Sequence, residues 1–199
     1  MAETTSRLSP LTGVILAGGA SRRMGGQDKG LVLFRGRPLV AWVAEALAPQ
    51  VDELIIIANR NLDAYRALGF AVFSDLRPEF PGPLAGFEAA LTCASHPWVV
   101  TCPTDAPLLP QDYVARLCST APRVPKVVSI DGRSQPVFSL LPKTALSALG
   151  AALDSGTRRV QTWLETLSPE AVPFDDCALQ MRDADCPEDL AALGNTLRP

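Results

Sequence analysis

Short apolar runs that suit β-strands alternate with stretches of helical spacing through the first half of this 199-residue chain. The runs cover residues 12–16, 54–57, 71–73 and 98–101. The second reads Leu-Ile-Ile-Ile without a polar interruption, which is typical of a strand covered on both faces of a parallel sheet. The alternation therefore predicts an α/β, Rossmann-like fold with a mostly parallel, doubly wound sheet and helices on both faces.

Helical spacing fills the intervals between these runs. Pro38 suits a first helical turn, and Leu39, Val43 and Leu47 follow it on one face. Two more helices are predicted, one over 63–68 that ends at Gly69 and one carrying an apolar stripe over 84–94.

The second half of the chain is less regular. Residues 126–130 and 136–140 predict two strands, and the Asp131-Gly132 turn between them favours a hairpin. Further helices are predicted over 146–153, 160–167 and 187–193, and short strands over 171–174 and 179–181. Because no repeat or linker interrupts the pattern, we expect one domain over 1–199, with halves at about 10–105 and about 106–199.

Composition excludes several classes of protein. The net charge of −3 argues against a nucleic-acid binder, and no apolar run approaches the length of a membrane span. Residues 1–10 do not resemble a signal peptide. The five cysteines form no C-x-x-C pair and the single histidine gives no zinc-ligand spacing, so we expect free thiols and a cytoplasmic protein.

A glycine-rich segment follows the first predicted strand. Five glycines between Gly18 and Gly30 allow close backbone approach to a ligand, and their N–H groups can form an anion-binding nest. Arg22, Arg23 and Lys29 add positive charge to the same segment, which suits a triphosphate. The segment lacks both the G-x-G-x-x-G fingerprint of dehydrogenases and the Walker A pattern. The alternative is a solvated turn.

Several motifs, taken in order, resemble a known family. They are Leu16-Ala17-Gly18-Gly19 with Arg23-Met24-Gly25, then Asp28-Lys29-Gly30-Leu31, then Gly82-Pro83-Leu84-Ala85-Gly86. Together they resemble the molybdenum cofactor guanylyltransferases, the MobA family, within the nucleotidyltransferase superfamily and its nucleotide-diphospho-sugar transferase type of fold. The resemblance implies that Leu16, Ala17, Gly18, Gly19 and Lys29 bind GTP. It also implies transfer of GMP to the phosphate of molybdenum-molybdopterin, with release of pyrophosphate.

Polar residues follow the other predicted strands. Asp105 lies after the fourth strand, and its carboxylate is the type of ligand that Mg²⁺ prefers beside phosphates. We expect Asp105 to bind the metal and the nucleotide; the alternative is a cap on the next turn. Asn59 and Asp75 follow the second and third strands, and the resemblance implies that both contact GTP. A role in turns is the alternative for each.

The resemblance also implies an acceptor site in the second half, formed by Gln135, Arg158 and Arg159. Two arginines near a helix N-terminus suit the terminal phosphate of molybdopterin, although either could simply be solvated. Asp183 and Asp185 stand where the family usually has asparagines. Asp185 is either a second Mg²⁺ ligand or the cap of the last helix.

The expected catalytic residues are Lys29, Arg23 and Asp105. The attacking phosphate oxygen is already anionic, so alignment and charge neutralisation carry the reaction without a strong base. Relatives imply handover to cofactor-insertion and molybdoenzyme chaperone proteins. Two other functions remain open: a nucleotidyltransferase using CTP or a sugar-phosphate acceptor, and a non-catalytic GTP-binding regulator.

Overall fold

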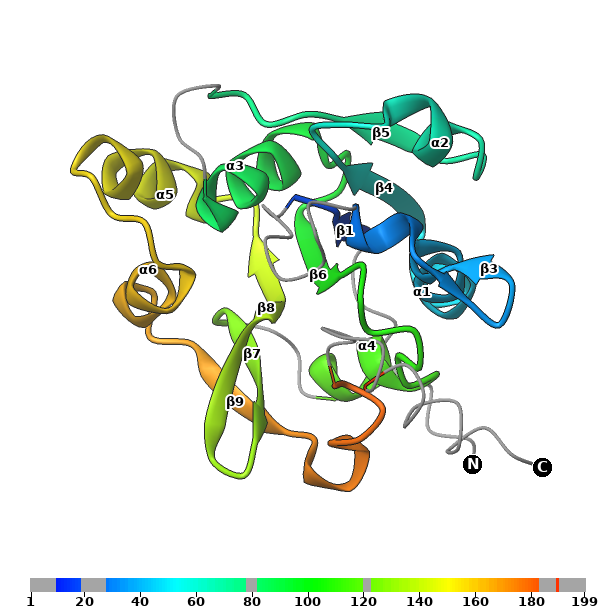
Figure 1. The fold of residues 1–199 in the computed structure, drawn as a ribbon. Coiled ribbons are helices and arrows are strands. Elements are labelled where there is room, and N and C mark those ends of the chain that lie inside the picture. The colour runs from blue at the N-terminus through cyan, green and yellow to red at the C-terminus, as the bar shows by residue number, and fades with distance from the viewer. Residues whose placement is uncertain (1–9, 19–27, 78–81, 120–122, 183–188, 190–199) are drawn as a thin grey trace.

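A computed structural model describes residues 10–18, 28–77, 82–119, 123–182 and 189 of the chain (Figure 1). Its strands are β1 (Leu11–Leu16), β2 (Leu33–Phe34), β3 (Arg37–Pro38), β4 (Glu53–Ile57), β5 (Ala71–Phe73), β6 (Trp98–Pro103), β7 (Lys126–Ile130), β8 (Arg133–Pro142) and β9 (Glu170–Pro173). Its α-helices are α1 (Leu39–Leu47), α2 (Leu62–Arg66), α3 (Pro83–Cys93), α4 (Tyr113–Leu117), α5 (Ala145–Asp154) and α6 (Val160–Thr166). The 3-10 turns within the described residues are η2 (Lys29–Leu31), η3 (Ala48–Gln50) and η4 (Asp175–Cys177).

Seven strands form one mixed sheet in the order β5-β4-β1-β6-β8-β7-β9. β1 pairs in parallel with β4 and with β6, and β4 pairs in parallel with β5. β8 runs antiparallel to both of its neighbours, β6 and β7, and β9 is parallel to β7. The sheet is therefore mostly parallel, as the sequence predicts, with its direction reversed at β8.

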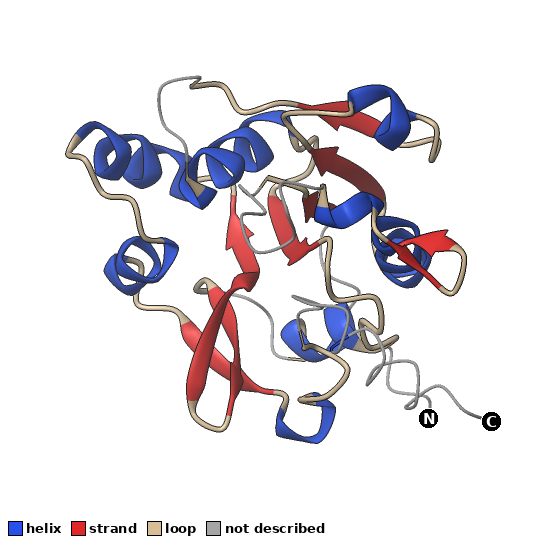
Figure 2. Cartoon of the chain, viewed as in Figure 1, coloured by secondary structure: helices blue, strands red, loops and turns tan. Residues whose placement is uncertain are grey.

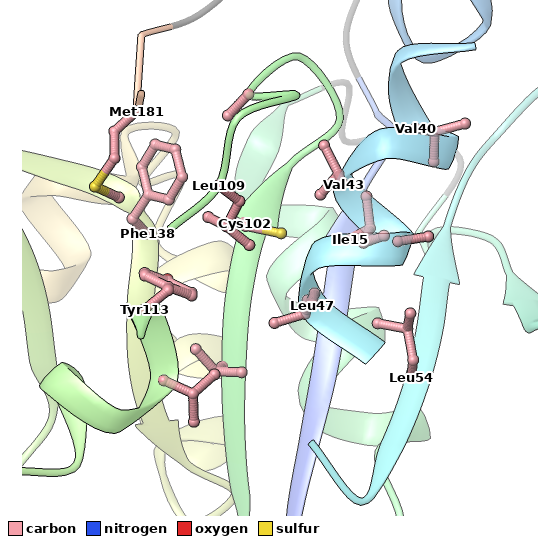
Figure 3. Close-up of a cluster of buried hydrophobic side chains, with 14 of the residues drawn as sticks. Ile15, Val40, Val43, Leu47, Leu54, Cys102, Leu109, Tyr113, Phe138 and Met181 are labelled. Atoms are coloured by element: carbon pink, nitrogen blue, oxygen red, sulfur yellow. The ribbon is translucent and has the colours of Figure 1, made fainter. Parts of the chain in front are cut away.

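Helices cover both faces of the sheet (Figure 2). Alternate strand residues point to opposite faces, so Ile15 belongs to the cluster under α1 and α4, whereas Val14 belongs to the cluster under α3, α5 and α6. Figure 3 shows the first cluster, which brings Ile15 and Cys102 together with Tyr113 and the α1 side chains. The near-complete burial of both clusters explains why the strands read as continuous apolar runs.

Most of the predicted elements are confirmed, with bounds that shift by a few residues. The predicted hairpin is β7–β8, where Asp131 and Gly132 both adopt positive φ, at 49° and 68°. Pro38 stands one residue before α1, and Gly69 follows α2 with a φ of 87°. The helix α4 and the small β2–β3 hairpin were not predicted; the strands of the hairpin have two residues each, too few to show an alternating pattern.

The strand predicted over 179–181 is wrong. The N–H groups of Gln180 and Met181 both donate to the carbonyl of Cys177, so the backbone turns there instead of extending. Leu179 is 63% exposed, whereas Met181 packs into the core beside Phe138 (Figure 3). The apolar alternation at these positions thus reflects one buried and one exposed side chain of a turn.

Two further expectations can be compared only with the described residues. Of the helix predicted over 187–193 only Asp189 is described, and it is helical. In the described parts of the chain, no helix is long and apolar enough to cross a membrane.

A carboxylate fastens the amino edge of the sheet. Glu53 of β4 accepts hydrogen bonds from the Thr12 hydroxyl of β1, at 2.5 Å, and from the backbone N–H and hydroxyl of Ser95, at 2.9 and 2.7 Å. Burial acts to raise the pKa of Glu53, but these hydrogen bonds outweigh it and lower the pKa below its usual range.

We expect Glu53→Gln to lower the free energy of unfolding by about 1 kcal/mol at pH 7, because an amide cannot replace the acceptor set. A carboxyl whose folded pKa is lowered stabilises the fold above its ordinary value of about 4.3. That contribution disappears as pH falls through the lowered pKa. Urea unfolding at a series of pH values below 7 should therefore show a gap between wild type and variant that narrows as the solution becomes more acid. Glu165→Gln, at an exposed helical contact, is the control; a gap that widened in acid would contradict this account.

Candidate active site

The candidate site lies at the carboxyl edge of the parallel strands. Gly18 follows β1, Asn59 follows β4, Asp75 follows β5 and Asp105 follows β6. Since these strands are parallel neighbours, their carboxyl ends meet at one edge, where ligands bind in open α/β sheets. The topology thus brings together predicted residues that are far apart in the sequence.

Lys29 and Asp105 form an ion pair at this edge. The Lys29 Nζ donates to Asp105 Oδ2 at 3.0 Å, across 76 positions of sequence. The two side chains are 22% and 12% exposed, so both still reach the surface of the site. Lys29, near the end of the glycine-rich segment, therefore meets the acid that follows β6.

Asp28 anchors the backbone immediately before Lys29. Its carboxylate accepts hydrogen bonds from the Asn61 side-chain amide at 3.0 Å and from the Tyr65 hydroxyl at 2.5 Å. Burial, then the hydrogen bond and charge of Asp28, raise the pKa of Tyr65, so its hydroxyl keeps the proton that it donates. Asp28 is thus bound on the α2 side, while its neighbour Lys29 faces Asp105.

Gly30 allows this segment to lie close to the β6 side of the sheet. A Cβ atom at Gly30 would be 2.5 Å from the Tyr65 hydroxyl oxygen and 3.1 Å from Thr104 Cγ2. Thr104 is the residue before Asp105. The absence of a side chain at Gly30 therefore sets how near Lys29 comes to Asp105.

Asn59 and Asp75 bind each other across the ends of β4 and β5. The Asn59 amide nitrogen donates to Asp75 Oδ2 at 2.7 Å, and the Asp75 N–H donates to Asn59 Oδ1 at 2.9 Å. The other carboxylate oxygen, Asp75 Oδ1, is buried and has no hydrogen-bond partner among the described residues. Burial raises the pKa of Asp75, with a smaller contribution from the charge of Glu88, against the lowering effect of Asn59.

The end of β1 lies against this pair. Ala17 donates its N–H to the carbonyl of Ile57 at 2.8 Å, which carries the parallel pairing past Leu16. A Cβ at Gly18 would lie 3.8 Å from the Asn59 amide nitrogen. Leu16, Ala17 and Gly18 are therefore beside the Asn59–Asp75 pair, whereas Gly19 and Arg23 fall outside the described residues.

Gln135 reaches the same edge from the second half. β8 is antiparallel to β6, with Thr101 opposite Ser139, so the start of β8 lies toward the carboxyl end of β6. Gln135 also borders an open cavity of about 480 Å³. The other residues that line it are Ile130, Ala178, Leu179, Met181, Arg182 and Asp189. Its mixed apolar and charged lining could hold a ring system with polar edges.

Arg158 and Arg159 lie in the segment between α5 and α6, and both are exposed. The backbone oxygen of Arg158 is 4.0 Å from the position of a Cβ on Gly82, at the start of α3. Arg159 stands one residue before α6, next to its N-terminus. The two arginines are therefore near the first turn of α3.

Three contributions to this edge were missed from the sequence. Asp28 and Tyr65 hold the Lys29 segment, and Arg182 borders the cavity. The signal for Asp28 was its place within the Asp28-Lys29-Gly30 motif, but its partners Asn61 and Tyr65 lie at the start of α2 and within it. Arg182 belongs to none of the sequence motifs and directly follows the strand wrongly predicted over 179–181.

The donors at this edge fit a metal that is shared with a ligand. In the described ranges, no three His, Cys, Asp or Glu side chains gather into a metal-binding group. Asp105 is one acidic oxygen donor beside Lys29, and Mg²⁺ commonly takes one or two carboxylates with substrate phosphates. Asp185, the expected second ligand, lies outside the described residues.

Comparison of the sequence with known families finds a match over residues 13–171 to the model described as the MobA-like NTP transferase domain. The molybdenum cofactor guanylyltransferase of Cupriavidus necator is 46% identical over 176 residues, which cover 84% of this chain and 88% of the relative. The protein of the same name from Vibrio campbellii is 42% identical over 183 residues, covering 91% and 93%.

Solved structures share the fold. The molybdopterin-guanine dinucleotide biosynthesis protein A from Archaeoglobus fulgidus superposes with a TM-score of 0.76 at 22% identity, covering 93% of this chain and 97% of that one. A 2-C-methyl-D-erythritol 4-phosphate cytidylyltransferase from Thermus thermophilus gives 0.69 at 17% identity, covering 94% and 98%. At these identities the likeness concerns the fold alone.

We expect Gly30→Ala to lower the free energy of unfolding by about 1–3 kcal/mol, because the added methyl group overlaps the Tyr65 hydroxyl. Gly150→Ala is the matched control. A Cβ there meets no atom within 4 Å, and alanine favours the α5 helix by up to about 1 kcal/mol. Denaturant unfolding of the two variants should thus move in opposite directions; equal stability would show that the Gly30 contact relaxes freely.

Proposed function

The chain belongs to the MobA-like NTP transferase family, and on that premise we propose that it transfers GMP from GTP to the phosphate of molybdenum-molybdopterin. The products are the molybdopterin guanine dinucleotide cofactor and pyrophosphate. The observation that carries the proposal is the Lys29–Asp105 contact, because it places a cation and a metal-binding acid where one triphosphate could contact both. The names of the relatives supply the choice of substrates.

The triphosphate would lie along the Gly18–Lys29 segment. Backbone N–H groups of the glycines, including Gly19, donate to its oxygens, and Lys29 and Arg23 neutralise the charge that develops on the departing pyrophosphate. Asp105 would hold Mg²⁺, which supplies Lewis-acid neutralisation of the phosphate oxygens when bound. Asp185 is the proposed second ligand.

The Asn59–Asp75 pair would receive the guanine base. Guanine presents an N1–H and an amino group on one edge, and a carboxylate can accept from both. The buried Asp75 Oδ1, which has no protein donor among the described residues, supports this role. A buried acceptor without a donor is costly, and a ligand that supplies the donor recovers that cost.

The acceptor would bind at the second half of the site. Gln135 and its cavity would take the pterin, while Arg158 and Arg159 would hold the terminal phosphate in line with the α-phosphorus of GTP. The phosphate oxygen attacks as an anion and needs no general base. We accordingly assign residues 10–105 of the single domain to the nucleotide and residues 106–199 to the acceptor.

The proposal also covers the partner proteins and the cellular location. A finished cofactor must pass to the enzymes that use it, which makes cofactor-insertion and molybdoenzyme chaperone proteins the proposed partners. The four described cysteines are unpaired, in keeping with the cytoplasmic location expected from the sequence.

We expect Asp105→Asn to reduce turnover by about 10²–10³-fold, as is typical when one preorganised charged group is lost. The amide keeps the size of the side chain and should leave the fold intact, which a thermal melt would verify. Pyrophosphate release with GTP, Mg²⁺ and molybdenum-molybdopterin measures the loss. Asp63→Asn, at an exposed ion pair of α2, is the control. Wild-type turnover in Asp105→Asn would remove Asp105 from the metal site.

A nucleotide competition assay tests the choice of base. GTP should displace a labelled GTP far better than CTP or ATP, and Asp75→Asn should reduce that preference by at least about 10-fold, or 1.4 kcal/mol. The pKa of Asp75 is raised, and only the ionised form accepts from both guanine donors. Its share of the affinity is therefore present at neutral pH and is lost as pH falls through that raised pKa.

The difference between wild type and Asp75→Asn should shrink at acid pH, which separates this effect from titration of GTP itself. Preference for CTP would instead support a cytidylyltransferase. Tight GTP binding without turnover on the authentic acceptor would support a regulatory module.

A further inference from the structure

Arg77 joins three parts of the chain at the edge of the candidate site. Its Nε donates to both carboxylate oxygens of Glu88 at 2.9 Å, and its second guanidinium nitrogen also lies 2.9 Å from Glu88. Its remaining nitrogen donates to Asp154 at 2.6 Å. Glu88 belongs to α3 and Asp154 ends α5, whereas Arg77 itself follows β5. One guanidinium thus connects the loop after β5 with two helices.

The Glu88 arm leads to the base-binding residue. Arg77 is two residues after Asp75, and Asp75 Oδ1 is 3.8 Å from the position of a Cβ on Gly86 in α3. Glu88 is 7% exposed and its charge acts on Asp75. By neutralising Glu88, Arg77 limits the repulsion between two carboxylates and holds the Asp75 loop against α3.

The Asp154 arm leads to the proposed acceptor segment. Asp154 is the last residue of α5, and the chain then turns through Gly156, whose φ is 87°, to Arg158 and Arg159. The N–H groups of Gly156 and Thr157 donate to the carbonyls of Leu153 and Ala152, so this turn is continuous with the helix end. A shift of Asp154 is therefore transmitted directly to the arginines.

We propose that Arg77 is a positioning residue that couples occupation of the guanine site to the placement of the acceptor-binding segment 155–159. The inference rests on the proposed function of Asp75, Arg158 and Arg159. GTP fixes the Asp75 loop; through Arg77 and Asp154 it then orders the segment that receives the acceptor phosphate. Because coupling free energies are reciprocal, acceptor binding would tighten GTP to the same degree.

Asp154→Asn tests the contact between Arg77 and Asp154 without unfolding the protein. The Asp154 side chain is 69% exposed, so removing its charge should leave stability almost unchanged, while the half-buried Arg77–Glu88 contact stays intact. Glu45→Gln is a matched control: Glu45 is 64% exposed, and its ion pair with Arg37 has the same 2.6 Å length on α1, a helix of the other face.

Hydrogen exchange of the full chain, with and without Mg²⁺ and GTP, is the first readout. GTP should slow exchange at the amides of Gly156 and Thr157 by about five-fold or more in wild type and in Glu45→Gln, and by much less in Asp154→Asn. The second readout is kinetic. Asp154→Asn should raise the KM for the acceptor by a similar factor and leave the affinity for GTP alone unchanged.

Arg77→Lys provides an independent variant. It keeps the positive charge beside Glu88 but loses the planar fork that reaches both carboxylates. Its loss of coupling should therefore not add to that of Asp154→Asn in the double variant, since both remove one connection.

Equal GTP-dependent protection in Asp154→Asn and wild type would overturn the coupling while leaving guanylyl transfer untouched. The same holds if wild type binds GTP but shows no protection over 155–159. Failure of wild type to bind GTP would overturn the proposed function and the coupling together.

Discussion

Strand β1 pairs in parallel with β4 on one side and with β6 on the other, and every part of the candidate site depends on that central position. Three neighbouring strands that run in one direction must end at one edge. The residues after them, Gly18, Asn59 and Asp105, consequently lie along one edge of the sheet although they are far apart in the sequence. The burial of Val14 and Ile15 on opposite faces holds β1 in this register, because a one-residue slip would exchange its two faces.

Contacts within the protein fix the direction of the polar groups of the site. Lys29 faces Asp105, Asn59 faces Asp75, and Asp28 is held by Tyr65, so each charged or amide group already has a defined direction. Such preorganisation favours phosphoryl transfer, in which alignment and charge neutralisation do most of the catalysis. In the proposed reaction a triphosphate and its metal would replace contacts within the protein, such as Lys29–Asp105, that have similar chemistry.

β8 runs antiparallel to β6 and marks the boundary between the two halves of the sheet, but the halves remain hydrogen-bonded neighbours. An antiparallel strand beside β6 begins where β6 ends, which brings Gln135 and its cavity to the nucleotide edge. On the face of the sheet that α3 and α5 cover, Arg77 connects the segment after β5 with these two helices. The proposed donor and acceptor regions therefore share both a sheet edge and a pair of helices.

Sequence patterns alone determined the α/β class, the first four sheet strands and the β7–β8 hairpin. These features are local, because each depends on the spacing of apolar residues or on turn residues such as Asp131-Gly132. Motifs also singled out Lys29, Asp105, Asn59 and Asp75. Only the tertiary structure decided their pairing, the support of Asp28 by Tyr65 and the bridging role of Arg77. Side-chain partners that lie on separate elements leave no periodic trace along the chain, since their distance is set by strand order and helix packing.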